Sequence, residues 1–389
     1  MINITEKKNC CGCGACAQSC PVGCITMTAD GEGFLYPVVD VEKCVNCGLC
    51  DRVCPILNPG VAPKDIRVYA AMCNDEEVRR TSSSGGVFYL LAEQALSDGG
   101  VVLGAAFDAD FSVHHVMVER IEDLPMIMGS KYLQSRIENT YVETEKELKK
   151  GRSVLFSGTG CQISGLKSYL HREYNNLYTI DVFCHGVPSP NVWRKYLDVQ
   201  KRTNDNGIRQ IYFRAKTQGW HQFSMRIEFN NGETYDCPHR EDAFMKVFLE
   251  NLCLRPSCYD CKFLESRSGA DLTIGDAWGV ENWMSHMDDN KGTSVVVVNT
   301  EKGRRLWAAI QGKLRSEEGD KDAILSCNPV YVGSVRPHPK REKFFSAFSA
   351  GASMEELVSL AKKPLWRRAI SFAKRCVKKL LKLCGIRIE

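Results

Sequence analysis

Residues 10–21 read CCGCGACAQSCP and residues 44–55 read CVNCGLCDRVCP, so the chain carries the same cysteine spacing twice near its N-terminus. Each run has the form C-x2-C-x2-C-x3-C-P, which binds a 4Fe-4S cluster through cysteine thiolates. In a chain with two such runs, the fourth cysteine of each run ligates the cluster of the other run. The two stretches therefore predict a module that holds two clusters and moves electrons.

The crossing of the fourth cysteines defines the two predicted ligand sets. They are Cys10, Cys13, Cys16 and Cys54 for one cluster, and Cys44, Cys47, Cys50 and Cys20 for the other. Cys11 and Cys24 fall outside the spacing and are interpreted as bystanders. Zinc is the alternative, because C-x2-C pairs also bind zinc. Zinc has no use for a third cysteine two residues on or for the Cys-Pro ending, so a ferredoxin-type module over residues 1–59 is favoured.

The composition of the chain is that of a globular protein. It has 389 residues, of which 44% are hydrophobic and 25% charged, which is enough for two or three domains and excludes general disorder. The N-terminus shows no apolar leader segment, so the 20 cysteines are expected in a reducing cytoplasm. No apolar run approaches the roughly 18 residues of a membrane span.

The C-terminal segment stands apart by its charge. Residues 362–389 hold ten of the 51 basic residues and one of the 47 acidic ones, so this segment carries +9 and the rest of the chain −5. Apolar residues recur in it every three or four positions, which predicts an amphipathic helix. Two interpretations stay open: peripheral contact with an anionic membrane on its inner face, or docking on the protein's own core. Nucleic acid is not an expected partner, because few aromatic residues accompany the basic ones.

Beyond a linker at residues 58–63, strands and helices alternate. Strands are expected at 68–72, 101–107, 154–156 and 178–183, with Gly-rich loops and helices after the first and third. Segments 208–215 and 224–230 look like an antiparallel insertion, and further strands are expected at 271–275 and 294–300. This order predicts a mixed α/β (α+β) domain behind the ferredoxin-like module, with no assignment between 310 and 345. The predicted divisions are 1–59, the two parts 66–150 and 151–340 of one domain, and the basic tail 341–389.

A second group of cysteines lies in this larger domain. Cys161 and Cys184 each follow the end of a predicted strand, where open α/β sheets build their binding crevice. Cys258 and Cys261 form another C-x2-C pair, and four cysteines are the complement for a third 4Fe-4S cluster. Cys253 is a rival ligand, and the residues alone do not decide between Cys161 and Cys253.

Five short motifs in a fixed order provide a more specific indication. They are Ser83–Gly86, Gly129–Tyr132, Gly158–Gln162, Cys258–Cys261 and Asp271–Asp276. With them the chain resembles, from about Val68 to Thr300, the coenzyme F-420 hydrogenase/dehydrogenase beta-subunit family. The resemblance implies a flavoprotein domain that holds FAD beside a 4Fe-4S cluster, with the family's cluster cysteines at Cys161, Cys184, Cys258 and Cys261. It does not imply that coenzyme F-420 itself is used.

The flavin site is predicted around the serine-glycine loop. Its glycines let the backbone approach a pyrophosphate, and free amides at the start of the following helix would face that anion. A serine N-cap with a glycine turn is the alternative. Lys131 is expected to place a positive charge near the flavin, unless it is a solvated surface lysine. The candidate cofactor-binding residues are Ser83, Ser84, Gly85, Gly86, Ser130, Lys131, Thr159, Gly292 and Ser294.

Two residues are candidates for catalysis, Lys131 and His185. His185 follows a predicted cluster ligand and is expected either to relay a proton or simply to be hydrogen-bonded in place. The sequence thus predicts an oxidoreductase that passes electrons between a redox partner protein, three 4Fe-4S clusters, FAD and a small organic or cofactor substrate. The alternatives are an electron-relay subunit of a larger hydrogenase or dehydrogenase complex, and a redox scaffold at a membrane surface.

Overall fold

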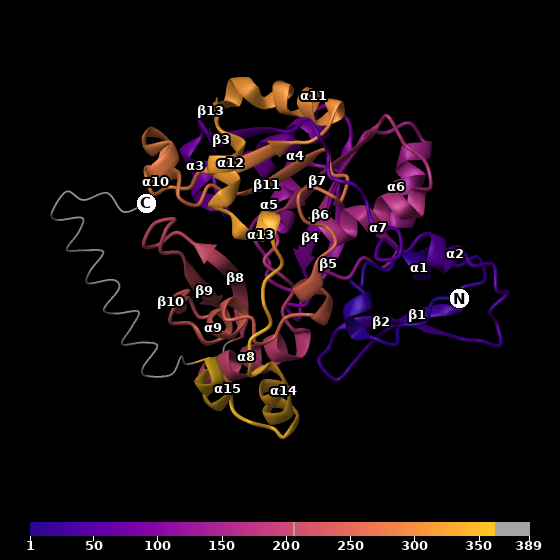
Figure 1. Ribbon diagram of the computed structural model, residues 1–389. Helices are drawn as coiled ribbons and strands as arrows, with labels where there is room; N and C mark the ends of the chain where they lie inside the picture. Colours follow the sequence, from indigo (N-terminus) through magenta and orange to yellow (C-terminus); the bar gives the residue numbers. More distant parts are fainter. Residues whose placement is uncertain (205–206, 362–389) are drawn as a thin grey trace.

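The computed structural model describes residues 1–204 and 207–361, and these form a small N-terminal module beside a large α/β domain (Figure 1). The basic amphipathic segment expected at 362–389 lies outside the described residues. Within the described part of the chain, no helix is both long and apolar enough to span a bilayer. The expected fold class, a ferredoxin-type module followed by a mixed α/β domain, is confirmed.

The N-terminal module is built from two similar halves. Each cysteine loop ends in a single helical turn, α1 (Ala15–Gln18) or α2 (Leu49–Arg52). The residue before each turn is a glycine in the left-handed region, Gly14 with φ 76° and Gly48 with φ 68°, which a side chain would disfavour. Strands β1 (Ile25–Ala29) and β2 (Leu35–Val39) pair antiparallel between the two halves. The glycines therefore let each loop fold back sharply around its cysteines.

A mixed sheet of eight strands forms the centre of the large domain. In spatial order the strands are β13 (Leu314–Glu318), β3 (Arg67–Cys73), β12 (Ser294–Val298), β11 (Leu272–Asp276), β7 (Leu177–Val182), β6 (Val154–Thr159), β4 (Val101–Phe107) and β5 (Val113–Val118). The four strands β4, β6, β7 and β11 run parallel to one another, whereas β5, β12, β3 and β13 are added antiparallel.

Helices cover both faces of this sheet. One face packs on α4 (Val87–Ser97) and α11 (Glu301–Ile310). The opposite face packs at one end on α6 (Thr140–Lys149), α7 (Gly160–Leu170) and the N-terminal module, and at the other end on α10 (Val280–Trp283) and α12 (Lys321–Ser326). β12 is completely buried, as its Ser-Val-Val-Val-Val sequence predicts. It ends at Val298 rather than near 300, because the hydroxyl of Thr300 accepts the Gly303 amide and caps α11.

The remaining helices complete this arrangement. In chain order they are α3 (Glu76–Thr81), α4 (Val87–Ser97), α5 (Leu124–Ile127), α6 (Thr140–Lys149), α7 (Gly160–Leu170), α8 (Pro190–Thr203), α9 (Ala243–Leu249), α10 (Val280–Trp283), α11 (Glu301–Ile310), α12 (Lys321–Ser326), α13 (Pro329–Val332), α14 (Arg341–Ser349) and α15 (Met354–Ala361). Short 3-10 turns occur at Lys7–Asn9, Ile121–Asp123, Pro256–Asp260, Ser285–Met287 and Gln311–Lys313.

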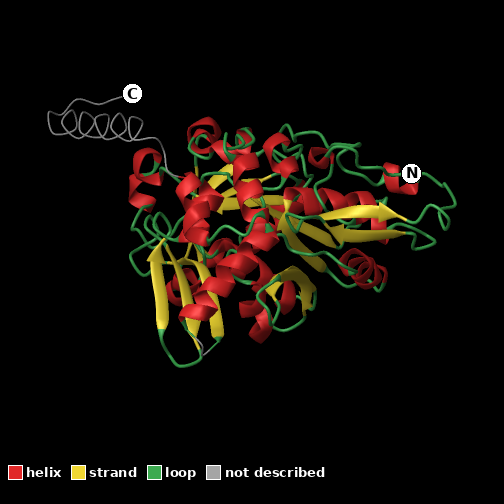
Figure 2. Ribbon diagram, turned by 90° about the horizontal axis from the view of Figure 1, so that it is seen from below, coloured by secondary structure: helices red, strands yellow, loops and turns green. Residues whose placement is uncertain are grey.

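The predicted antiparallel insertion is a separate three-stranded sheet (Figure 2). It contains β8 (Ile208–Ala215), β9 (Ser224–Phe229) and a third strand, β10 (Thr234–Pro238), that was not predicted from the sequence. An aromatic core that includes Trp193, Phe213 and Phe244 lies between this sheet and the helices α8, α9, α14 and α15. The stretch 310–345, which has no clear pattern in the sequence, provides the edge strand β13 and the helices α12 and α13.

The N-terminal module packs directly on the large domain. The side chain of Cys13 contacts Gly165 of α7, where an added Cβ would lie 2.9 Å from the Cys13 Cβ. Gln18 of α1 accepts the backbone amide of Tyr141 at 3.1 Å. The two parts also share one hydrophobic core, so the cysteine loops are held at a fixed place against α7.

Candidate iron-sulfur and flavin site

The fourth cysteine of each N-terminal run lies beside the other run, as the crossing predicts. Cys20 and the three cysteines at 44, 47 and 50 line one hollow near the surface. On the inner side, Cys10 and Cys54 act electrostatically on Cys16, and burial is the main cause that raises the pKa of the Cys16 thiol to about 12. Such thiols would lose their protons when a metal binds. Cys24 is not remote from this chemistry, since its sulfur lies 3.3 Å from that of Cys20.

The two cysteine sets of the module differ in their exposure. Cys47 is exposed, whereas Cys13, Cys16, Cys50 and Cys54 are buried. The set containing Cys47 therefore forms the outer site of the module, and the set containing Cys10 and Cys13 forms the inner site, against α7.

The four cysteines predicted to hold a third cluster converge on one cavity of the large domain. Cys161 stands in the first turn of α7, Cys184 follows β7, and Cys258 and Cys261 belong to the 3-10 turn at Pro256–Asp260 and its end. The carboxyl ends of the parallel strands β6 and β7 bring the first two together. The backbone amide of Val187 donates to the Cys258 sulfur at 3.3 Å, a contact typical of cluster ligands.

Burial raises the pKa of the Cys258 thiol to about 12 and that of Cys261 to about 11.

Cys253 does not line this cavity. It is buried in the aromatic core of the insertion, so the described structure places Cys161 with the other three cysteines and leaves Cys253 apart.

Cys11, outside the predicted ligand sets, lies at this cavity too. Its thiol interacts with those of Cys13 and Cys161. The contact with Cys13 and burial raise the pKa of the Cys11 thiol well above the usual range, although the contact with Cys161 lowers it. No pattern in the sequence indicates this position, because the contact joins a loop of the N-terminal module to a helix of the large domain.

A second cavity of about 640 Å³ adjoins the cysteine cavity. The two share a wall made by Cys11, Thr159, Cys161, Cys184 and His185. Its size lies in the range of small-molecule and cofactor sites. Of the predicted flavin-binding residues, it is lined by Ser83, Ser84, Gly86, Ser130, Lys131, Thr159 and Ser294.

Gly85 and Gly292 do not line the large cavity and instead allow close backbone packing behind it. The Gly85 amide donates to the Ser294 hydroxyl at 2.9 Å, and an added Cβ on Gly85 would lie 2.4 Å from the Ala71 carbonyl oxygen. A Cβ on Gly292 would lie 2.6 Å from the carbonyl oxygen of Ser84. These two glycines therefore position the loop rather than face the cavity.

Helix α4 points its N-terminus into the cavity without a capping side chain. Its N-cap is Gly86, with φ 88°, and no side chain of the described residues accepts a hydrogen bond there. The neighbouring serines are engaged elsewhere: the Ser84 hydroxyl donates to the Thr293 carbonyl, and the Ser83 hydroxyl accepts from Ser130. The alternative of a serine N-cap is therefore wrong, and the first amides of α4 remain available to an anion.

Lys131 is half-buried in the cavity wall and is not a solvated surface lysine. Its ammonium group donates to the Met128 carbonyl at 2.8 Å and lies 5.6 Å from the centre of the Phe107 ring. Desolvation lowers the pKa of this ammonium group to about 7. Within the described chain it makes no ion pair, so its charge is free to pair with a bound anion.

His185 is held by neighbours on both sides. Its Nε2 lies 2.7 Å from the Asn251 side-chain oxygen, and its ring packs edge-on against Phe248. Burial lowers the pKa of the imidazole. This geometry fits the interpretation that His185 is hydrogen-bonded in place. A proton relay by His185 stays a prediction.

The cavity wall also contains an ion pair that was not predicted from the sequence. The buried guanidinium of Arg214 on β8 donates to both carboxylate oxygens of Asp276 at 2.7 and 2.9 Å, and Trp220 donates to the same carboxylate. Arg214 also lies 4.0 Å above the Phe223 ring. Asp276 ends one of the five motifs, whereas Arg214 has no distinguishing signal in its strand.

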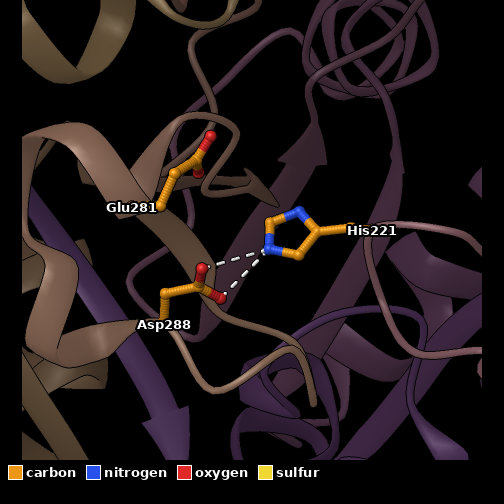
Figure 3. Close-up of side chains that lie close together, drawn as sticks. All are labelled: His221, Glu281 and Asp288. Carbon is orange, nitrogen blue, oxygen red and sulfur yellow. Dashed lines mark hydrogen bonds and ion pairs between the residues drawn. The ribbon is translucent and has the colours of Figure 1, made fainter. Parts of the chain in front are cut away.

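A further group of polar side chains is formed around His221, which lines the large cavity. Figure 3 shows His221, Glu281 and Asp288, whose ligating atoms lie within 4.8 Å of one another. His221 Nε2 is 3.1 Å from an Asp288 oxygen, an ordinary histidine–carboxylate contact. Glu281 is exposed to solvent, so this group supplies no sheltered metal site.

The fold and the paired cysteine loops define an iron-sulfur protein that transfers electrons. Residues 9–57 match the model of the 4Fe-4S dicluster domain, and residues 151–323 match the model of the C terminus of the coenzyme F-420 hydrogenase/dehydrogenase beta subunit. Over residues 151–323 the chain is therefore similar to the C terminus of that beta-subunit family, and this stretch follows one that is similar to a 4Fe-4S dicluster domain. The resemblance stated from the motifs is confirmed.

Among solved structures, the chain is similar to one from the F-420-reducing NiFe hydrogenase complex of Methanosarcina barkeri, studied by xenon derivatization. The identity is 16%, the TM-score is 0.49, and the match covers 76% of this chain and 95% of that one. No curated protein matches the chain.

Proposed function

We propose that the protein is an iron-sulfur flavoprotein oxidoreductase. It would pass electrons between the two ferredoxin-type 4Fe-4S clusters, a third 4Fe-4S cluster, FAD and an organic substrate. One observation carries this proposal: the cavity with four cysteine thiols and the cavity of about 640 Å³ share the wall made by Cys161 and Cys184. A carrier of single electrons in the first cavity would thus border directly on a cofactor in the second.

The polar groups of the large cavity support an anionic cofactor such as FAD. The uncapped N-terminus of α4 offers backbone amides to the pyrophosphate, next to the serine loop. Lys131 offers a positive charge that has no carboxylate partner among the described residues. Bound there, FAD would supply the conversion between single-electron carriers and two-electron chemistry on a substrate.

The set of sulfur donors in the cysteine cavity suits a third 4Fe-4S cluster. Four thiols from three separate segments converge, and a backbone amide already points at one sulfur. Cys161, Cys184, Cys258 and Cys261 would hold the cluster, while Cys11 would contact it without being a required ligand. His185 would keep its place against Asn251 in the wall between the two cavities.

An anaerobic flavin-reduction assay tests this function. A chemically reduced ferredoxin is added to the purified protein, and the loss of flavin absorbance is followed in time. We expect rapid bleaching in the wild type and in Cys253→Ala, and much slower bleaching in Cys258→Ala with its N-terminal clusters intact. Equal rates in Cys258→Ala and wild type would show that the four-thiol cavity takes no part.

A second candidate function is an electron-relay subunit without a substrate of its own. The matching family model describes a beta subunit, which favours a place within a larger complex. The outer cysteine loop, with Cys47 exposed, suits a redox partner protein under either function. An isolated protein that reduces dyes but none of a panel of flavoenzyme substrates, and gains activity only with a partner, would favour the relay.

The basic segment 362–389 carries a separate proposal from its sequence alone. Its charge of +9 and its apolar periodicity support peripheral contact with an anionic membrane. Co-sedimentation with vesicles of anionic lipid, but not of zwitterionic lipid, and its loss on deletion of 362–389 would support this contact.

A further inference from the structure

Arg255 occupies the contact between the N-terminal module and the cysteine cavity. It precedes Cys258 by three residues, and only 1% of its surface is exposed. Its Nε donates to the Cys10 carbonyl at 2.9 Å, one terminal nitrogen donates to the Leu35 carbonyl at 2.8 Å, and the other donates to the Gln134 side chain at 3.2 Å. The guanidinium also lies 4.3 Å from the centre of the Tyr36 ring.

This buried charge has no carboxylate partner among the described residues. Three arginines of the described chain are buried, and the other two are neutralised: Arg79 pairs with Asp289, and Arg214 pairs with Asp276. Arg255 meets carbonyls, an amide, aromatic rings and one cysteine sulfur, and none of these is a carboxylate. An uncompensated buried charge is costly, so a negative group is expected close to it.

The negative groups within its reach are cysteine sulfurs. One terminal nitrogen of Arg255 lies 3.6 Å from the Cys10 sulfur, which belongs to the predicted inner cluster of the module. The same side chain lines the cavity of Cys161, Cys184, Cys258 and Cys261. A cluster held by four thiolates is an anion, and each one-electron reduction makes it more negative. The guanidinium therefore stands between two sites where negative charge would collect.

We propose that Arg255 sets the reduction potentials of the inner ferredoxin cluster and of the third cluster by holding one positive charge between them. The inference rests on the proposed function for its third cluster. A nearby positive charge in a poorly solvated site stabilises the added electron, so both potentials are higher than they would be without it. Arg255 acts through its charge and is not a cluster ligand. Because it raises the potential of the inner cluster, it favours the transfer of electrons from the outer cluster to the inner one.

The outer cluster serves as an internal control. Its cysteines, Cys20, Cys44, Cys47 and Cys50, make no contact with Arg255 in the described structure. Its potential is therefore expected to stay unchanged when the charge at residue 255 is removed.

The test is a redox titration of the holoprotein, followed by electron paramagnetic resonance. Arg255→Gln removes the charge. Gln134→Glu keeps the guanidinium but places a carboxylate where the 3.2 Å hydrogen bond now lies. We expect both variants to shift the inner and third clusters to more negative potentials and to leave the outer cluster in place. Should Arg255→Gln assemble poorly, Gln134→Glu decides alone.

Arg341→Gln is the matched control for a loosened contact between the two parts. Arg341 also joins them, but it does so through the Glu32 carboxylate at 3.1 Å and does not line the cysteine cavity. We expect Arg341→Gln to lower the unfolding temperature without moving any potential. Unchanged potentials in Gln134→Glu, with its full iron content, would overturn the proposal and leave Arg255 as a structural clamp.

Failure of the proposed function produces a different result. If the wild type holds about eight iron atoms and shows only two cluster signals, the third cluster is absent. The effect of Arg255 on the inner cluster is still measured in that protein, against the same outer control.

Discussion

The thiol of Cys11 in the first ferredoxin loop contacts the thiol of Cys161 at the start of α7. The inner end of the N-terminal module is thereby joined to the four-cysteine cavity of the large domain, and that cavity borders the large one. The described chain thus brings the two predicted cluster regions and the predicted flavin site into direct contact.

Substitution of Cys161 and of Cys11 shows which of the two cysteines is a ligand of the third cluster. We expect Cys161→Ala to lose about four iron atoms per chain and Cys11→Ala to lose none, because only the first belongs to the four-thiol set. Iron and acid-labile sulfide analysis measures both, with Cys253→Ala as the control for a buried cysteine elsewhere. Loss of iron in Cys11→Ala but not in Cys161→Ala would reverse the assignment.

We expect Lys131 to make the proposed binding of FAD depend on pH. In the flavin-free protein, desolvation lowers the pKa of its ammonium group to about 7, and a bound anion raises it again. FAD binding would therefore take up a proton above pH 7. We expect the affinity for FAD to be greatest below about pH 7 and to fall as the pH rises, by up to about tenfold per pH unit.

Equilibrium titration of flavin-free protein with FAD at several pH values checks this dependence. Lys131→Arg, which stays charged, is expected to bind FAD with little pH dependence, and Lys131→Met is expected to bind weakly throughout. A wild-type profile identical to that of Lys131→Met would contradict a role for this charge.

Ser83 holds the serine-glycine loop against the loop of Ser130. Its hydroxyl accepts from both the amide and the hydroxyl of Ser130, at 2.7 and 3.0 Å. Ser83→Ala leaves these donors without their partner, at a cost of about 1–3 kcal/mol, and we expect FAD affinity to fall roughly tenfold. Ser326→Ala, in the exposed part of α12, should bind FAD as the wild type does.

The ion pair of Arg214 and Asp276 stabilises the wall of the large cavity. Asp276→Asn leaves a buried guanidinium without its counter-charge, and we expect a loss of about 3–5 kcal/mol in the free energy of unfolding. Glu301→Gln, which breaks an exposed pair with Arg304, should cost less than about 1 kcal/mol. Denaturant unfolding compares the two, and similar small losses would mean that the buried pair is not needed.

Local patterns predicted much of the fold and of the cysteine sites. The cysteine spacings placed eight thiols, and the rule that parallel strands end at one edge predicted that Cys161 and Cys184 meet. Lys131 and the α4 loop were predicted from motifs. Arg255 was not, because its partners Cys10, Leu35 and Gln134 lie far away in the sequence. Arg214 was missed for a similar reason. An arginine in a predicted strand is expected to be exposed, and the sequence does not show which other element buries it.

The most direct test of the proposed electron path is the content of iron, acid-labile sulfide and flavin in protein purified without oxygen. We expect about twelve iron atoms, about as many sulfides and about one FAD per chain, for three clusters beside a flavin. About eight iron atoms and no flavin would contradict the path, because the bound redox centres would then be the two clusters of the N-terminal module alone.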